Sequence, residues 1–217
     1  MTAREEILQR VSSGVGKPAD FAGRRAAAEA ALAAPVRGPQ PVMGAELVVR
    51  FQAKAESLAS TVARVANPVQ AVAAVADYLA AGALATAAVV TADVGAYDWA
   101  SGGLTVRVGA AVDADLVGIS GCFCAIAETG TLMLLSGPAT PASVSLLPET
   151  HIALVRLSRI VATMEDAFAL LRRELGEIPR AINFISGPSR TGDIEQTIVL
   201  GAHGPCRVHL VLMGDTE

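Results

Sequence analysis

Aromatic residues, charged residues and cysteine are all scarce in this chain of 217 residues. Aromatics make up 4% and charged residues 18%, against 52% hydrophobic residues. A core with so few aromatics must be aliphatic, as in α/β sheets that are buried on both faces. The net charge of −4 argues against a general nucleic-acid binder, because such proteins carry a basic face.

The three cysteines, Cys122, Cys124 and Cys206, are too few for a disulfide framework, a four-cysteine zinc site or a conventional iron–sulfur cluster. We interpret them as small buried hydrophobic residues in a reducing compartment. A partial metal or redox role remains the alternative. We expect no metal and no cofactor in this chain.

A long apolar run is also lacking. The start of the sequence is charged and has no apolar signal core. The nearest candidate span, residues 78–92, is about 15 residues long, whereas a transmembrane helix needs about 20. We therefore expect a cytoplasmic protein without a transmembrane segment.

Glycine and proline concentrate near the N-terminus. Residues 2–12 alternate charged and aliphatic residues at helical spacing, and residues 13–45 surround an Ala-rich island at 26–34 with Gly and Pro. The island predicts one or two helical turns. We divide the chain into an N-terminal helix and Pro/Gly-rich arm at 1–45 and an α/β domain at 46–217; the arm either wraps the core or reaches a partner.

Short apolar runs alternate with amphipathic stretches beyond residue 45. Asn67 and Pro68 are typical of a helix start, with Asn as the N-cap. This alternation predicts an α/β fold with a mostly parallel sheet and helices on both faces. The expected helices are 44–60, 68–81 and 158–175, and the main expected strands are 61–65, 84–91, 104–108, 131–136, 152–157, 181–185 and 207–213.

Two short motifs of the sequence are rich in polar residues and glycine. The one nearer the C-terminus, called the second motif, follows the expected strand 181–185. It reads Ser-Gly-Pro-Ser-Arg-Thr-Gly-Asp-Ile-Glu over residues 186–195. Ligands of open α/β sheets bind beyond the carboxyl ends of strands, and an Arg fork suits carboxylate or phosphate. The alternative is a tight turn whose Asp caps a helix. The candidate ligand-binding residues are Gly187, Ser189, Arg190, Thr191, Asp193 and Glu195.

The first motif, Ala127–Thr131, ends another apolar run. Glu128 is either a catalytic or ligand-orienting carboxylate or a structural acceptor for loop N–H groups. Thr129, Gly130 and Thr131 either contact a ligand or close the turn. We expect this turn and the second motif to lie at the same edge of the sheet, near His203.

The three histidines differ in their surroundings. His203 lies between small and rigid residues in Gly201–Pro205, and we take it as a second candidate catalytic residue. His151 precedes a strand and is a candidate ligand-binding residue, with a loop hydrogen bond as the alternative. His209 alternates with apolar residues in the last strand and is interpreted as structural.

These motifs together resemble a known family. The ordered segments AIAETGTLMLLS, SLLPETHIALV, FISGPSRTGDIEQTIVLGAHGP and RVHLVLMG are similar to the LUD domain of the lactate utilization protein C family. The resemblance covers roughly residues 60–214. It implies a three-layer α/β/α fold of the NagB/RpiA/CoA-transferase-like group.

The resemblance also implies a function. The family takes part in bacterial oxidation of L-lactate to pyruvate beside iron–sulfur partner proteins, which would carry the clusters. For this chain it implies a small carboxylate or phosphate ligand. Whether the chain is itself an enzyme or a non-cluster subunit of a lactate-oxidising complex stays open, and a homo-oligomer is compatible with the sequence.

Two other functions remain. One is a stand-alone CoA-transferase or isomerase-like enzyme in which Glu128 acts as nucleophile or base, a hypothesis based on fold analogy. The other is a non-catalytic scaffold subunit that uses the arm at 13–45.

Overall fold

The computed structural model describes residues 2–15, 21–34, 36–191 and 199–214. The chain divides into two compact units, Met1–Gln40 and Pro41–Glu217. Each unit is described by itself.

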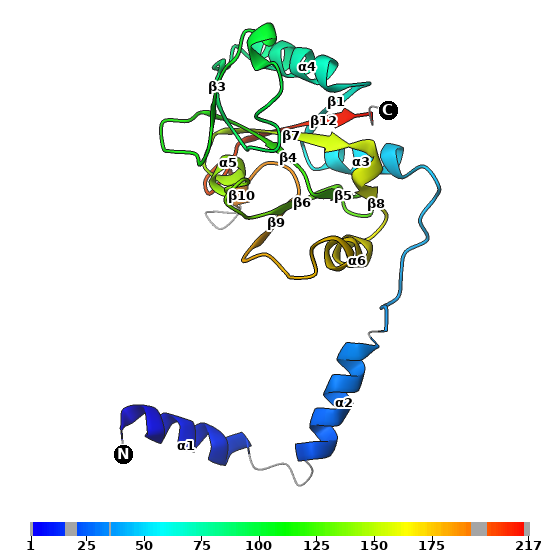
Figure 1. Ribbon diagram of the computed structural model, residues 1–217, viewed down its shortest axis with the longest axis vertical. Helices are drawn as coiled ribbons and strands as arrows, with labels where there is room; N and C mark the ends of the chain where they lie inside the picture. The colour runs from blue at the N-terminus through cyan, green and yellow to red at the C-terminus, as the bar shows by residue number, and fades with distance from the viewer. Residues whose placement is uncertain (1, 16–20, 35, 192–198, 215–217) are drawn as a thin grey trace. The chain divides into compact units, whose positions relative to one another are not determined.

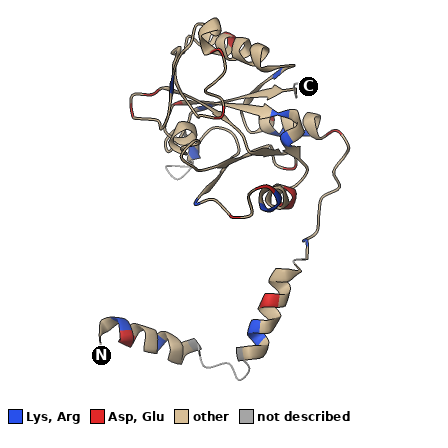
Figure 2. Ribbon diagram, viewed as in Figure 1, with Lys and Arg blue, Asp and Glu red and all other residues tan. Residues whose placement is uncertain are grey.

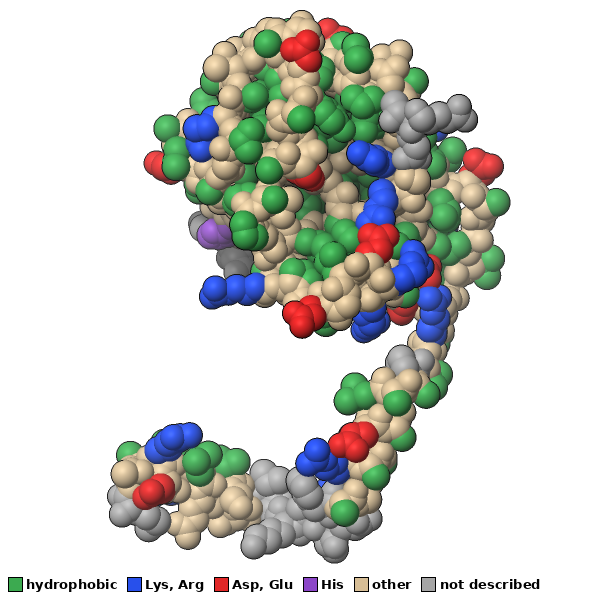
Figure 3. Space-filling model, viewed as in Figure 1, with side chains coloured by type: hydrophobic (Ala, Val, Ile, Leu, Met, Phe, Trp, Pro, Cys, Tyr) green, Lys and Arg blue, Asp and Glu red, His purple; other side chains and the backbone are tan. Residues whose placement is uncertain are grey.

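The first unit contains two helices, α1 (Ala3–Val15) and α2 (Phe21–Ala33). The helix expected at 2–12 is confirmed. The Ala-rich island forms a helix of 13 residues, longer than expected, because alanine has the highest intrinsic helix propensity. Ile7, Leu8 and Val11 of α1 are largely exposed, and Figure 3 shows hydrophobic side chains on the surface of both helices.

The centre of the second unit is a six-stranded parallel sheet with strand order β1-β12-β7-β4-β2-β3 (Figure 1). Strand β12, the last along the chain, lies between β1 and β7. The strands of this sheet are β1 (Thr61–Val65), β2 (Ala87–Val90), β3 (Thr105–Val108), β4 (Val117–Gly121), β7 (Thr150–Arg156) and β12 (Arg207–Met213).

A second, mixed sheet has four strands in the order β8-β5-β6-β9. Strand β6 pairs antiparallel with both β5 and β9, and β8 pairs parallel with β5. Its strands are β5 (Cys124–Ile126), β6 (Thr131–Leu135), β8 (Ile160–Val161) and β9 (Ile182–Ile185). A two-stranded antiparallel pair, β10 (Arg190–Thr191) and β11 (Val199–Leu200), follows β9.

Three apolar clusters hold these layers together. Helix α4 (Pro68–Ala81) and the 3-10 helix η1 (Trp99–Gly102) cover one face of the six-stranded sheet. Helix α3 (Leu47–Ser57) contributes Phe51 and Ala55 to the cluster that joins the two sheets. Helix α6 (Met164–Leu175) packs on the other face of the second sheet, and Figure 2 shows residues of both charge signs along it.

The expected α/β class, with a mostly parallel sheet flanked by helices, is confirmed. The second sheet was not foreseen. The helix expected from residue 158 begins at Met164, because Thr163 and Asp166 form a capping box there. Residues 157–161 form instead the 3-10 helix η2 (Leu157–Arg159) and strand β8.

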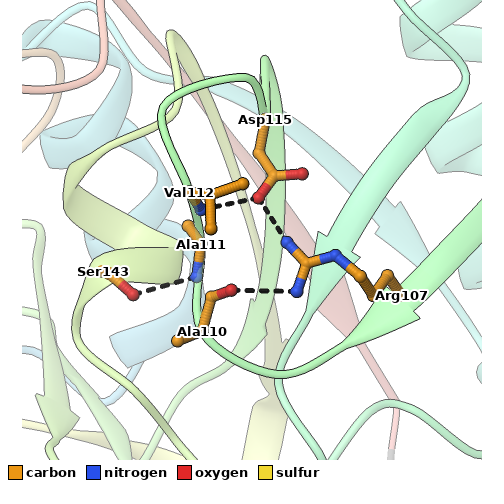
Figure 4. Close-up of polar contacts among 6 residues, drawn as sticks. All are labelled: Arg107, Ala110, Ala111, Val112, Asp115 and Ser143. Carbon is orange, nitrogen blue, oxygen red and sulfur yellow. Dashed lines mark hydrogen bonds and ion pairs between the residues drawn. The ribbon is translucent and has the colours of Figure 1, made fainter.

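The loop between β3 and β4 is held by one carboxylate. Asp115 accepts a hydrogen bond from the Val112 N–H at 2.7 Å and forms an ion pair with Arg107 (Figure 4). The Ala111 N–H donates to Ser143 Oγ of the short helix α5 (Ser143–Leu146). The loop is thereby tied to the end of the sheet at which β4 begins.

Within the described ranges, none of the helices combines the length and the apolar character that a membrane span requires.

Candidate functional site

The two motifs meet through a chain of hydroxyl groups. Residues 127–130 form the turn of the β5–β6 hairpin. Thr129 Oγ1 donates to Thr131 Oγ1 at 2.7 Å, and Thr131 Oγ1 lies 2.7 Å from Ser186 Oγ at the start of the second motif. The antiparallel pairing of β6 with β9 brings these residues together. The structure therefore places both motifs at one end of the second sheet.

Two glycines fit these motifs against the end of helix α3. Gly130 has φ +69°, and a Cβ there would lie 2.6 Å from the Ala55 backbone nitrogen. Gly187 has φ +83°, and a Cβ there would contact the Leu58 carbonyl. Both positions need a left-handed backbone conformation and close approach, which glycine alone permits. These two glycines therefore allow the motifs to pack closely against the end of α3.

The second motif is also bonded to the loop that carries His203. The Ser189 N–H donates to the Pro205 carbonyl at 2.8 Å, and the Gly201 N–H donates to the Ser189 carbonyl at 2.9 Å. His203 itself is exposed. The expected proximity of residues 201–205 to this motif is therefore present in the backbone.

The charged candidates have different surroundings. Arg190 is exposed, and its Nη2 donates to the Leu58 carbonyl at 2.8 Å, which places it at the C-terminal end of α3. Glu128 is half-buried, and its backbone N–H donates to the Ala162 carbonyl. Thr191 is half-buried in β10. Asp193 and Glu195 lie outside the described residues.

His151 lies away from this cluster, on strand β7. It is fully buried, and its Nε2 is 2.9 Å from Ser120 Oγ of β4. Burial lowers the pKa of His151 from 6.5 to about 4, so the ring is neutral at pH 7. Its Nδ1 has no hydrogen-bond partner within the described part of the chain.

A cavity of about 200 Å³ opens at the carboxyl ends of β2 and β4, next to Ser120. The strand pairs Leu134–Asn183 and Thr131–Ser186 lie at opposite ends of β6 and β9, so the cavity and the hydroxyl cluster occupy opposite ends of the second sheet. The residues that line the cavity are Thr91, Asp93, Ser120, Gly121, Cys122, Phe123, Leu134, Leu135, Thr140, Pro141, Ala142, Ser145 and Asn183.

The sequence reasoning missed the polar residues of this cavity. Asp93 directly follows the apolar run 84–91, and Ser120 falls near the end of β4. The rule that ligands bind beyond strand carboxyl ends would have selected both. Asn183 gives no comparable signal, because it lies inside a short apolar strand.

The described cysteines are not joined to each other. Burial raises the pKa of Cys122, and it raises that of Cys124 to about 11, so both are thiols at pH 7. No group of three or more His, Cys, Asp or Glu residues that could hold a metal ion occurs within the described ranges.

Residues 110–213 match the family model of the LUD domain, and this range includes both motifs and the loop 201–205. The chain is 41% identical to lactate utilization protein C of Bacillus subtilis over 102 residues. This aligned stretch covers 46% of this chain and 42% of that protein. The corresponding protein of Shouchella clausii is 43% identical over 101 residues, covering 46% and 44%.

A solved structure agrees over a longer stretch. A DUF162 family protein from Deinococcus radiodurans matches with a TM-score of 0.57 and 26% identity, covering 80% of this chain and 100% of that chain. The sequence matches span less than half the length of the curated relatives. Residues 110–213 are therefore similar to the LUD domain, and this part of the chain is similar to the lactate utilization C proteins.

Proposed function

We propose that this chain is a component of a bacterial system that oxidises L-lactate to pyruvate, acting in the cytoplasm beside iron–sulfur lactate utilization proteins. The observation that supports the proposal is the identity of about 40% to lactate utilization C proteins from several bacteria. The iron–sulfur partners would carry the electrons, and this chain would contribute a site for a small anion.

We propose that the small anion binds where the two motifs and the loop 201–205 meet. Arg190 has five N–H donors, and one of its nitrogens is bonded to the Leu58 carbonyl. The guanidinium is exposed, so its remaining donors can pair with a carboxylate in a bidentate manner. His203, in the loop that is hydrogen-bonded to this motif through Ser189, would accept the hydroxyl proton of a 2-hydroxy acid at a ring nitrogen.

The test is titration of L-lactate and pyruvate into the full chain, alone and with its iron–sulfur partners. Binding should weaken by about ten- to a hundredfold in Arg190→Ala, because the loss of one charge-assisted hydrogen bond costs roughly 1.5–3 kcal/mol. Arg180→Ala, on another exposed arginine, is the matched control. The absence of binding in both preparations would refute the proposal of an anion site.

A genetic experiment tests the pathway separately. A bacterium that lacks its lactate utilization C gene should regain growth on L-lactate when this chain is expressed with its own partners. Failure of this growth, with the chain present at normal levels, would refute the role in lactate oxidation.

A further inference from the structure

The cavity at the carboxyl ends of β2 and β4 lies between the two sheets, where most side chains are apolar. Strand residues that face this space elsewhere include Leu132, Ile185 and Val155, all in the cluster that joins the sheets. At the cavity, Ser120 and Asn183 are polar. Because a buried polar group costs free energy unless it is hydrogen-bonded, a polar atom here that the protein leaves unpaired requires another partner.

Asn183 supplies the clearest sign of such a partner. Its neighbour Phe184 contacts Phe168 of α6, with ring centroids 5.9 Å apart, so Asn183 faces the opposite way, into the space between the sheets. Its Nδ2 is buried and has no hydrogen-bond partner among the described residues. An unsatisfied buried amide N–H carries a desolvation penalty, which a ligand acceptor would offset.

Ser120 adds a hydroxyl on the facing sheet. Its Oγ is 2.9 Å from His151 Nε2. If Nε2 donates, the Ser120 hydroxyl hydrogen is left for the cavity; if Nε2 accepts, the Ser120 lone pairs are left. In both tautomers, Ser120 keeps hydrogen-bonding capacity toward a molecule in the cavity.

The charge of the lining selects the kind of ligand. Among the described residues that line the cavity, Asp93 alone is charged, and its carboxylate lies against Gly121. A carboxylate repels anions and accepts hydrogen bonds from hydroxyl groups. Phe123, Leu134 and Leu135 supply apolar walls. The volume of about 200 Å³ is below the roughly 300–1,000 Å³ of typical ligand sites, which suits a compact molecule.

We infer that this cavity is a second binding site, which takes a small hydroxylated molecule without negative charge, of the polyol or sugar class. Asn183 Nδ2 donates to a ligand oxygen, Asp93 accepts from ligand hydroxyls, and Ser120 completes the polar side. The site is distinct from the anion site proposed at Arg190, and neither proposal depends on the other.

Glycerol and D-ribose are the probes for this site. In NMR titrations of the isotope-labelled full chain, they should shift the Gly121 backbone amide and the Asn183 side-chain amide in a saturable manner. L-lactate should leave both resonances in place. Asn183→Leu and Asp93→Asn should each weaken binding about tenfold, the ratio that corresponds to about 1.4 kcal/mol.

Controls separate binding from folding. Asp113→Asn, a matched change at another exposed carboxylate, should leave probe binding unchanged. If Asn183→Leu fails to fold, Asp93→Asn remains decisive, because Asp93 is exposed and the change is isosteric. Absence of saturable shifts with both probes, equal binding by wild type and Asp93→Asn, or L-lactate shifts at Asn183 would each overturn the inference.

Discussion

Thr131 and Ser186, which are 55 positions apart in the sequence, have hydroxyl oxygens 2.7 Å apart. This contact joins the first motif to the second. Thr131 is 3% exposed, so the bond is shielded from water on one side. The free energy that this hydrogen bond contributes to folding decides whether the two motifs behave as one unit.

The first prediction is a coupling between these two positions. Thr131→Val and Ser186→Ala should each destabilise the protein, and the double mutant should cost about 0.5–1.5 kcal/mol less than the sum, the usual net value of a hydrogen bond. Urea unfolding of the four proteins measures the coupling. Thr131→Val combined with Ser101→Ala, in η1, should be additive. Additivity in the first cycle would show that the hydroxyl contact contributes nothing.

The second prediction separates backbone conformation from packing at glycine. Gly130 has φ +69° and Gly103, which follows η1, has φ +74°, but a Cβ at Gly103 meets no atom within 4 Å. Gly103→Ala should cost only the left-handed strain of about 1–2 kcal/mol. Gly130→Ala should cost about 2–5 kcal/mol, because overpacking against α3 adds roughly 1–3 kcal/mol. Equal losses in chemical denaturation would contradict the close approach to α3.

The third prediction concerns pH. Burial lowers the pKa of His151 and His209 from 6.5 to about 4. Between these values the unfolded chain binds more protons, so the free energy of unfolding falls as pH falls through the window. Each histidine can account for up to about 3 kcal/mol of this loss.

Urea unfolding at pH 7 and pH 4.5 measures this dependence. His151→Gln should lower stability at pH 7 but flatten the pH dependence. His203→Gln is the control, because His203 is exposed, and it should keep the wild-type slope. A slope that is unchanged by His151→Gln would show that this ring does not carry the effect.

The fourth prediction concerns Arg159. It forms an ion pair with Glu174 at 2.7 Å, its Nε donates to the Phe123 carbonyl at 2.7 Å, and its guanidinium lies 4.7 Å from the Phe123 ring centroid. Glu174→Gln should cost less than about 1 kcal/mol, as for other exposed ion pairs. Arg159→Ala should cost more, because it also removes the contacts to Phe123. Thermal unfolding of both variants compares them, and equal losses would show that only the ion pair matters.

Local signals predicted several elements correctly. Asn67 and Pro68 indicated the start of α4, and Asn67 does accept a hydrogen bond from the Gln70 N–H. The meeting of both motifs followed from their positions next to strands. The four-stranded sheet was not predictable in this way, because β6 pairs with β9 across about 50 residues and short apolar runs do not specify their partners.

The direction of the Asn183 side chain in the cavity could not be predicted from the sequence for the same reason. Asn183 sits inside an apolar strand, and only the pairing of β9 with β6 and the contact of Phe184 with α6 reveal that Asn183 faces the six-stranded sheet. The packing roles of Gly130 and Gly187 were likewise hidden, because the residues they contact belong to the end of α3, more than 70 positions earlier for Gly130.

The position of β12 in the sheet has a consequence for the order of events during synthesis. Its two neighbours, β1 and β7, are made long before it. Until β12 leaves the ribosome, β1 has no strand partner in this sheet and β7 has one unpaired edge. Such edges and non-local parallel pairings favour slow folding and aggregation. The nascent chain should therefore depend on chaperones until residues 207–213 are free to insert between these strands.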